Sequence, residues 1–162
     1  MAEVTVEVKA PGEGESGALA VPVFDEDGAR FSEGLDGALR DRLARLAEEG
    51  ELKSERGKTV LLHTDDEVPF VRVVAVGLGK RDEMDADTLR TAAATVVARL
   101  DGVGGSVTWT IDETLPLPPN EQAGAIVEGT VLGSYDPGRW KSEQNETKPV
   151  EKVVLSLSLI HI

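Results

Sequence analysis

Residues 70–100 read FVRVVAVGLGKRDEMDADTLRTAAATVVARL, and three patterns follow one another along them. A near-continuous aliphatic run predicts a buried strand, and Gly77-Leu78-Gly79-Lys80 predicts a tight loop. The remainder predicts an amphipathic helix that Asp85 caps, with apolar residues at helical spacing: Leu89, Ala93, Val96 and Leu100. A strand, a glycine loop and a helix in this order form the building unit of an α/β sheet.

Similar patterns lie on both sides of these residues. Further strands are predicted at residues 4–8, 18–24, 59–64, 106–111 and 153–157. A short polar connection separates residues 59–64 from the strand at 71–76, which allows the two to pair as a hairpin. Two more helices are predicted, one at 35–46 capped by Ser32 and ended by Gly50, and one at 123–132 capped by Asn120. We therefore predict one α/β domain, a mixed sheet of about six strands flanked by helices on both faces.

Several single residues refine this prediction. Pro22 has no backbone N–H, so it places its strand at an edge or at an irregularity of the sheet. Trp109 lies on the apolar face of its strand and is expected in the core, whereas Trp140 is either an interface anchor or packs locally. Three glycines of the last predicted helix either weaken it or mark close packing against a neighbour: Gly124, Gly129 and Gly133.

Composition excludes several classes of function. The 162 residues carry 30 acidic and 17 basic side chains, a net charge of −13 that argues against a nucleic-acid partner. The acidity fits either simple solubility or adaptation to high intracellular salt. The chain has no cysteine, and the sequence shows no apolar run of the ~18 residues that a membrane span needs. The first ten residues, MAEVTVEVKA, do not resemble a secretory signal, so we expect no membrane association and a cytoplasmic location.

The glycine loop is the first candidate for chemistry, because backbone amides at the start of a helix can cradle a phosphate. However, no serine or threonine follows Lys80, and the third glycine of the dinucleotide fingerprint would fall on Asp82. Four carboxylates crowd the start of the next helix and would repel an anion: Asp82, Glu83, Asp85 and Asp87. A turn in which glycine supplies a positive φ is therefore favoured over phosphate binding.

Other catalytic patterns are weak. The two histidines are His63, inside a predicted strand, and His161, near the carboxyl terminus. The acidic run at residues 65–67 is favoured as a solvated turn over a metal site. Ser106 begins a strand, and no G-x-S-x-G elbow is present. We therefore expect no catalytic, cofactor-binding or metal-ligating residue in this chain.

The motif VGLGK, ending at Lys80, resembles the amino-terminal domain of the leucyl aminopeptidases, also called cytosol aminopeptidases. The strand at 18–24, the helix start DADTLR at 85–90 and the helix at 123–132 are similar to that family in the same order. Tyr135 and RWKS at 139–142 resemble the aromatic pair and lysine that follow its last helix. Here Pro137, Gly138 and Trp140 depart from the usual aromatic spacing. The resemblance covers roughly residues 3–157.

The resemblance implies a macro-like α/β domain attached to a larger peptidase domain that binds two divalent metals, manganese or zinc. That peptidase domain carries the segments NTDAEGRL and TFDSGG, neither of which occurs here, so no residue inherits a catalytic or metal-binding role. The family assembles as hexamers. The partners implied are the catalytic domain of the same protein and the other subunits.

The leading hypothesis is that residues 1–157 form the non-catalytic amino-terminal domain of an aminopeptidase, which serves assembly and access to the active site. Residues 158–162 are expected to be a non-native tail of a truncated fragment, and the downstream coding sequence would test this. The alternative is a stand-alone macro-like module that binds a nucleotide or ADP-ribose between Gly77 and Lys80. A small hydrolase with an unrecognised site ranks third.

Overall fold

The structure is a computed structural model, and it describes residues 5–9, 17–25, 29–30, 37–64, 71–103, 105–134 and 150–157. The strands are β1 (Thr5–Lys9), β2 (Ala18–Asp25), β3 (Ala29–Arg30), β4 (Thr59–His63), β5 (Arg72–Gly79), β6 (Ser106–Ile111) and β7 (Lys152–Leu157). The helices are α1 (Gly37–Glu48), the 3-10 turn η1 (Arg81–Glu83), α2 (Ala86–Arg99) and α3 (Pro119–Gly133).

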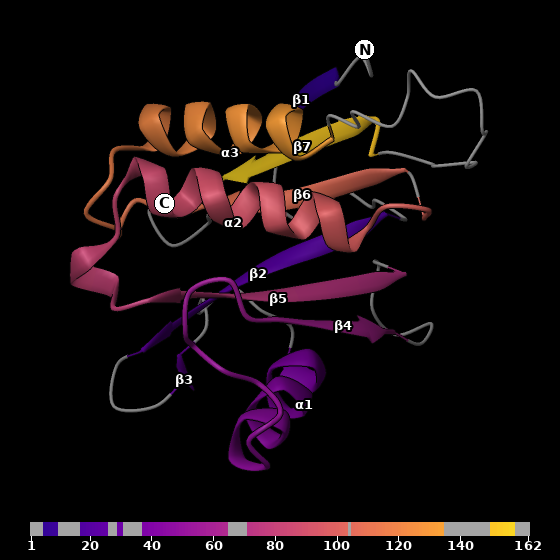
Figure 1. Cartoon of the computed structure of the whole chain (residues 1–162), viewed down its shortest axis with the longest axis vertical. Helices are drawn as coiled ribbons and strands as arrows, with labels where there is room; N and C mark the ends of the chain where they lie inside the picture. The colour runs from indigo at the N-terminus through magenta and orange to yellow at the C-terminus, as the bar shows by residue number, and fades with distance from the viewer. Residues whose placement is uncertain are drawn as a thin grey trace.

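The strands form one mixed sheet in the order β1-β7-β6-β2-β5-β4 (Figure 1). The first five strands of this order run parallel, and β4 pairs antiparallel with β5, which confirms the predicted hairpin. The seventh strand, β3, has two residues and pairs with the end of β2. So short a strand has no periodicity to detect, and the sequence analysis did not predict it.

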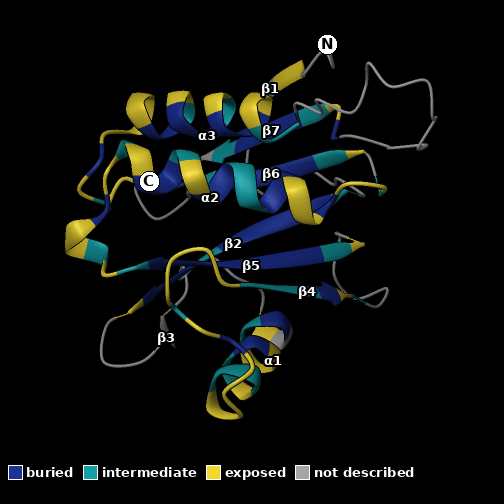
Figure 2. Cartoon of the chain, in the orientation of Figure 1, coloured by how far each residue is buried: buried dark blue, intermediate teal, exposed yellow. Residues whose placement is uncertain are grey.

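Helices cover both faces of the sheet, as predicted. The larger core lies under α2 and α3 and includes the fully buried Trp109, so the prediction for this tryptophan is confirmed. The smaller core lies under α1, where Leu39 and Leu43 pack against β2, β4 and β5. Side chains of β2 alternate between the cores, with Ala20 in one and Val21 in the other. Figure 2 shows buried residues along the strands and on the inward sides of α2 and α3.

Pro22 lies in an interior strand, at an irregularity. β2 pairs with β6 only at Ala18 and Leu19, and its register against β5 shifts between Val23 and Phe24. Pro22 therefore lies beyond the paired part of the β2–β6 ladder, where the missing N–H costs less. Beyond Leu19 of β2 and Thr108 of β6 the two strands are no longer paired, and they diverge towards their carboxyl ends.

The start of α3 differs from the prediction. The helix begins at Pro119, Pro118 takes the cap position without a side-chain hydrogen bond, and Asn120 lies inside the first turn. Proline suits the first helical position because its missing N–H would have no helical partner there. Asn120 is therefore not the cap, whereas Asp85 caps α2 as predicted. Ser32, the predicted cap of α1, lies outside the described residues.

Asp85 forms a capping box with Thr88. The backbone amide of Thr88 donates to Asp85 Oδ1 at 2.8 Å, and the Thr88 hydroxyl donates to the same oxygen at 2.8 Å. These two hydrogen bonds, the backbone one above all, hold the pKa of the Asp85 carboxyl below its ordinary value of 3.8. The ionised carboxylate is therefore the form that stabilises the start of α2.

The Asp85 contribution is expected to depend on pH. Because its pKa is lower in the folded chain, its stabilisation is present above the unfolded-state value and is lost as the pH falls through the folded-state value. Asp85→Asn keeps a capping side chain but removes the titration. We expect wild type to melt at a higher temperature than Asp85→Asn at pH 7, with a smaller gap at pH 3. A gap that stays constant in thermal melts across this range would contradict the assignment.

Helices α2 and α3 approach each other closely at two glycines. A Cβ placed on Gly129 would lie 2.1 Å from the carbonyl oxygen of Arg90 and 2.8 Å from Ala93 Cβ, and one on Gly133 would lie 2.7 Å from Ala94 Cα. The close-packing interpretation is confirmed for these two glycines. A Cβ on Gly124 would meet no atom within 4 Å, so that interpretation fails for the third. Arg90 Nε also donates to Glu128 Oε2 at 2.8 Å across the two helices.

Gly129→Ala is expected to destabilise the chain by about 1–3 kcal/mol, because α2 and α3 must move apart to admit the methyl group. Gly124→Ala is the matched control in the same helix. It should raise the free energy of unfolding by roughly 0.5–1 kcal/mol, since alanine favours a helix and this position has room. Urea unfolding followed by circular dichroism compares the two variants, and equal effects would refute the close-packing account.

Candidate functional site

The prediction of a tight loop at Gly77-Leu78-Gly79-Lys80 is wrong for its first three residues, which form the end of strand β5, where Gly77 and Gly79 pair with β2. This glycine segment is held against the segment that precedes β4. Gly79 N–H donates to the Ser54 carbonyl at 2.8 Å, and Gly77 N–H donates to the Lys58 carbonyl at 2.8 Å. A Cβ on Gly77 would lie 2.0 Å from the carbonyl oxygen of Glu55, so only glycine fits there. Gly79 has φ +77°, a conformation that favours glycine. Both glycines of the motif therefore have a structural reason. The expected positive φ is confirmed at Gly79, but Gly79 lies in strand β5 and not in a turn.

The surroundings of this loop suit an anion poorly. Lys80 is exposed, and so are the four carboxylates that follow it: Asp82, Glu83, Asp85 and Asp87. A cavity of about 110 Å³ borders the loop, lined by Arg56, Gly57, Gly77, Asp87, Thr88, Thr91 and Ala92. Pockets for drug-sized ligands measure roughly 300–1,000 Å³, so a nucleotide or ADP-ribose would not fit this one. The geometry gives no support to nucleotide binding between Gly77 and Lys80.

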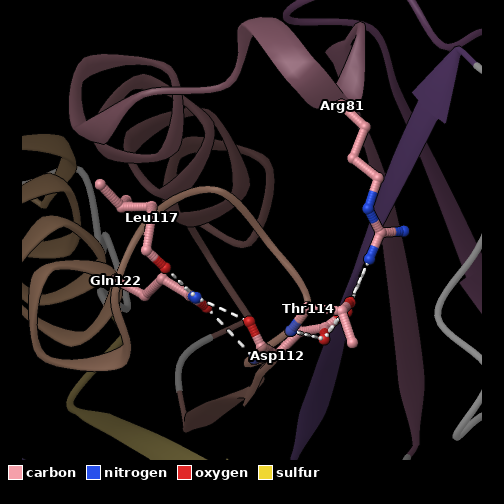
Figure 3. Close-up of polar contacts among 5 residues, drawn as sticks. All are labelled: Arg81, Asp112, Thr114, Leu117 and Gln122. Carbon is pink, nitrogen blue, oxygen red and sulfur yellow. Dashed lines mark hydrogen bonds and ion pairs between the residues drawn. The ribbon is translucent and has the colours of Figure 1, made fainter.

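A second polar cluster occupies the carboxyl end of the sheet, where β2 and β6 diverge and where α/β sheets hold ligands. Arg81 reaches across from η1: its Nη2 lies 3.4 Å from Asp112 Oδ2 and also donates to the Thr114 hydroxyl oxygen (Figure 3). The same guanidinium stacks 5.3 Å from the ring centroid of Phe24, at the end of β2. Arg81 thus connects Phe24, near the end of β2, with Asp112 and Thr114, which follow β6.

Gln122 extends this cluster into the core. The side chain is 1% exposed and forms three hydrogen bonds to main-chain atoms of the loop before α3. Its Nε2 donates to the carbonyls of Asp112 and Leu117, both at 2.7 Å, and its Oε1 accepts from the Asp112 N–H at 3.2 Å (Figure 3). The amide therefore holds the β6–α3 connection in one conformation.

The sequence analysis did not single out Gln122, Arg81 or Asp112. A signal for Gln122 was present, because it shares a helix face with Ala125, Ile126 and Gly129, at spacings of three, four and seven residues. A polar residue on an apolar stripe requires internal hydrogen bonds. The Arg81–Asp112 pair joins residues 31 positions apart and has no such local signal.

The other candidates from the sequence do not come together. His63 is exposed at the end of β4, and its carbonyl accepts a hydrogen bond from Arg42 Nη1 at 3.0 Å. The acidic run at 65–67, Tyr135, Trp140 and His161 lie outside the described residues. In the part of the chain that the structure describes, no group of three or more His, Cys, Asp or Glu side chains could hold a metal ion. No helix within the described ranges is long and apolar enough to cross a membrane.

Comparison with known sequences identifies the family. The pattern of the cytosol aminopeptidase family, N-terminal domain, matches residues 20–144. This chain belongs to the cytosol aminopeptidase family. The probable cytosol aminopeptidase of a Geobacter species is 35% identical over 132 residues, which are 81% of this chain and 26% of that protein. The one of Corynebacterium diphtheriae is 34% identical over 143 residues, 84% of this chain and 26% of that protein.

Solved structures show the same fold for this cytosol aminopeptidase domain. A mutant tomato leucine aminopeptidase superposes with a TM-score of 0.70 and 21% identity, covering 98% of this chain and 33% of that one. The bottromycin maturation enzyme BotP, also solved in complex with Mn, superposes with a TM-score of 0.61 and 23% identity, covering 87% and 27%. Measured against the two cytosol aminopeptidase sequences above, the chain spans about a quarter of the length of the curated relatives it matches.

Proposed function

We propose that this chain is the non-catalytic amino-terminal domain of a metal-dependent aminopeptidase that acts in the cytoplasm, with a role in subunit assembly and in access to the active site. One observation carries the proposal: the N-terminal domain pattern matches residues 20–144, while the chain spans only 26% of its cytosol aminopeptidase relatives. The proposed partners are the catalytic domain of the same polypeptide and other subunits. The catalytic domain would supply the two divalent metals, manganese or zinc, and the peptidase chemistry.

The polar cluster at the carboxyl end of the sheet supports a structural role for this domain. Asp112 Oδ1 accepts hydrogen bonds from the Thr114 N–H at 2.9 Å and from its hydroxyl at 2.6 Å, and Oδ2 faces Arg81. Gln122 is engaged on both its amide nitrogen and its oxygen. Polar side chains whose hydrogen bonds are made within the domain stiffen a loop, and these bonds would have to break before the same groups could bind a substrate. The net charge of −13 supports the absence of a nucleic-acid partner.

The proposal predicts that the purified chain does not hydrolyse leucine amide, with or without added Mn²⁺. The control is the polypeptide that the complete gene encodes, assayed under the same conditions, which should release leucine. Turnover by the isolated chain above the buffer rate would refute the non-catalytic role. A gene that ends after the codon for Ile162 would refute the proposal that this chain is one domain of a longer aminopeptidase.

The assembly role is tested on the same full-length protein. Light scattering after size exclusion compares its mass with that of a form lacking residues 1–157. We expect the shortened form to assemble into smaller particles or to lose activity within intact particles. If the shortened form has the same assembly mass and the same rate of hydrolysis as the full-length protein, the domain has no role in assembly or in access to the active site.

A further inference from the structure

One flank of α3 is apolar and is only partly covered by the rest of the domain. Ala123, Val127 and Val131 recur every four residues and therefore line one side of the helix. Ala123 is half-buried against the larger core, Val127 is half-buried, and Val131 is 43% exposed. Apolar side chains on an outward flank mark surfaces that another element covers.

The contacts of α3 fix the direction of this flank. Gly129 and Gly133 face α2 on one side, and Ile126 packs into the core above the sheet. Going round the helix from α2 past the sheet, the next residues are Ala123 and Val127. They therefore lie on the flank of α3 away from α2. Figure 1 shows α2 on one side of α3 and the edge strand β1 on the other.

The edge strand continues the apolar surface. Val6 of β1 is in register with Val153 of β7, which belongs to the core under α2 and α3, so Val6 faces the same side of the sheet. It is 44% exposed. Within the described ranges β1 pairs with β7 alone and ends the sheet on this side. We call Val6, Ala123, Val127 and Val131 the edge surface.

We propose that the edge surface is where this domain docks on the remaining part of its own polypeptide, the peptidase domain; this inference rests on the proposed function. The relatives have about three quarters of their length outside the matched domain, which supplies an occupant tethered to this chain. A second copy is disfavoured at this surface, because the exposed carboxylate of Glu121 on the same helix would approach the negatively charged surface of an identical chain.

Hydrogen–deuterium exchange tests the docking site. The full-length polypeptide is compared with this chain at the same dilute concentration. Amides of residues 5–9 and 123–133 should exchange about fivefold or more slowly in the full-length protein, whereas those of α1 should not change. No slowing at these residues overturns the proposal. Slowing that appears in the isolated chain as its concentration rises also overturns it, because a second copy would then be the occupant.

A matched pair of substitutions separates docking from folding. Val131→Lys alters the edge surface, and Val71→Lys alters a valine of similar exposure, 48% against 43%, just before β5. Both variants of the isolated chain should melt like wild type. In the full-length protein only Val131→Lys should restore fast exchange at residues 5–9, and equal effects of the two variants would contradict the assignment. This readout is independent of hydrolysis, so the docking site and the aminopeptidase proposal can fail separately.

Discussion

Replacing Gln122 with leucine is expected to lower the free energy of unfolding by about 2–4 kcal/mol. The leucine would fill the same space but would leave the Asp112 N–H and the Asp112 and Leu117 carbonyls without the side-chain amide that now binds them. Because Gln122 is 1% exposed, water does not reach these groups without local opening. The loss should appear as a lower urea midpoint in circular dichroism.

Asn120→Leu is the control for this substitution. Asn120 lies in the same first turn of α3 but is exposed, so the same change of side chain should shift stability by only about 0.5 kcal/mol. If Gln122→Leu proved as mild as Asn120→Leu, the hydrogen bonds of Gln122 would not be what holds the β6–α3 connection.

Gly77→Ala is expected to cost about 3 kcal/mol, because the new methyl group would overlap main-chain atoms and not a movable side chain. The three atoms nearest to that methyl, all within 3 Å, are the carbonyl oxygen and carbon of Glu55 and the carbonyl carbon of Ser54. Relief requires the segment before β4 to move away from β5, which would also weaken the hydrogen bond from Gly77 N–H to Lys58. Urea unfolding measures the cost.

The second glycine of the motif provides the comparison. A Cβ on Gly79 would meet only the flexible side chain of Arg56, at 3.3 Å, so Gly79→Ala mainly incurs the strain of a positive φ, about 1–2 kcal/mol. We therefore expect Gly77→Ala to be the more damaging variant. The reverse order would show that backbone strain, and not close approach, explains the glycines of VGLGK.

Much of the fold followed from local patterns. The alternation or run of apolar residues located the strands, the stripe of Leu89, Ala93 and Val96 located α2, and the polar link between residues 59–64 and 71–76 indicated a hairpin. These features are encoded within a few residues, because burial on one face repeats with the period of the strand or helix. Asp85 was recognised as a cap because its capping hydrogen bond reaches only three residues along the chain, to Thr88.

Features that depend on partners distant in the sequence were not recovered. Three glycines of α3 look alike in sequence, yet only Gly129 and Gly133 contact α2, since the helix crossing decides which positions approach. Asn120 was predicted as a cap because asparagine favours that position, but the prolines before it set an earlier start for α3. Arg81 and Asp112 are 31 residues apart in the sequence and meet only because η1 and the end of β6 lie at the same end of the sheet.

The sequence by itself determined the α/β class and, through VGLGK and the order of its elements, the family to which the chain belongs. The tertiary structure alone showed that Gly77 to Gly79 extend strand β5 and explained why they are glycine-rich. Position 77 admits only glycine, because the backbone of Glu55 lies against it. At the carboxyl end of the sheet, Arg81 pairs with Asp112, and Gln122 binds the main chain of Asp112. Local sequence records burial and backbone conformation, whereas contacts between distant segments arise only when the sheet and helices have packed.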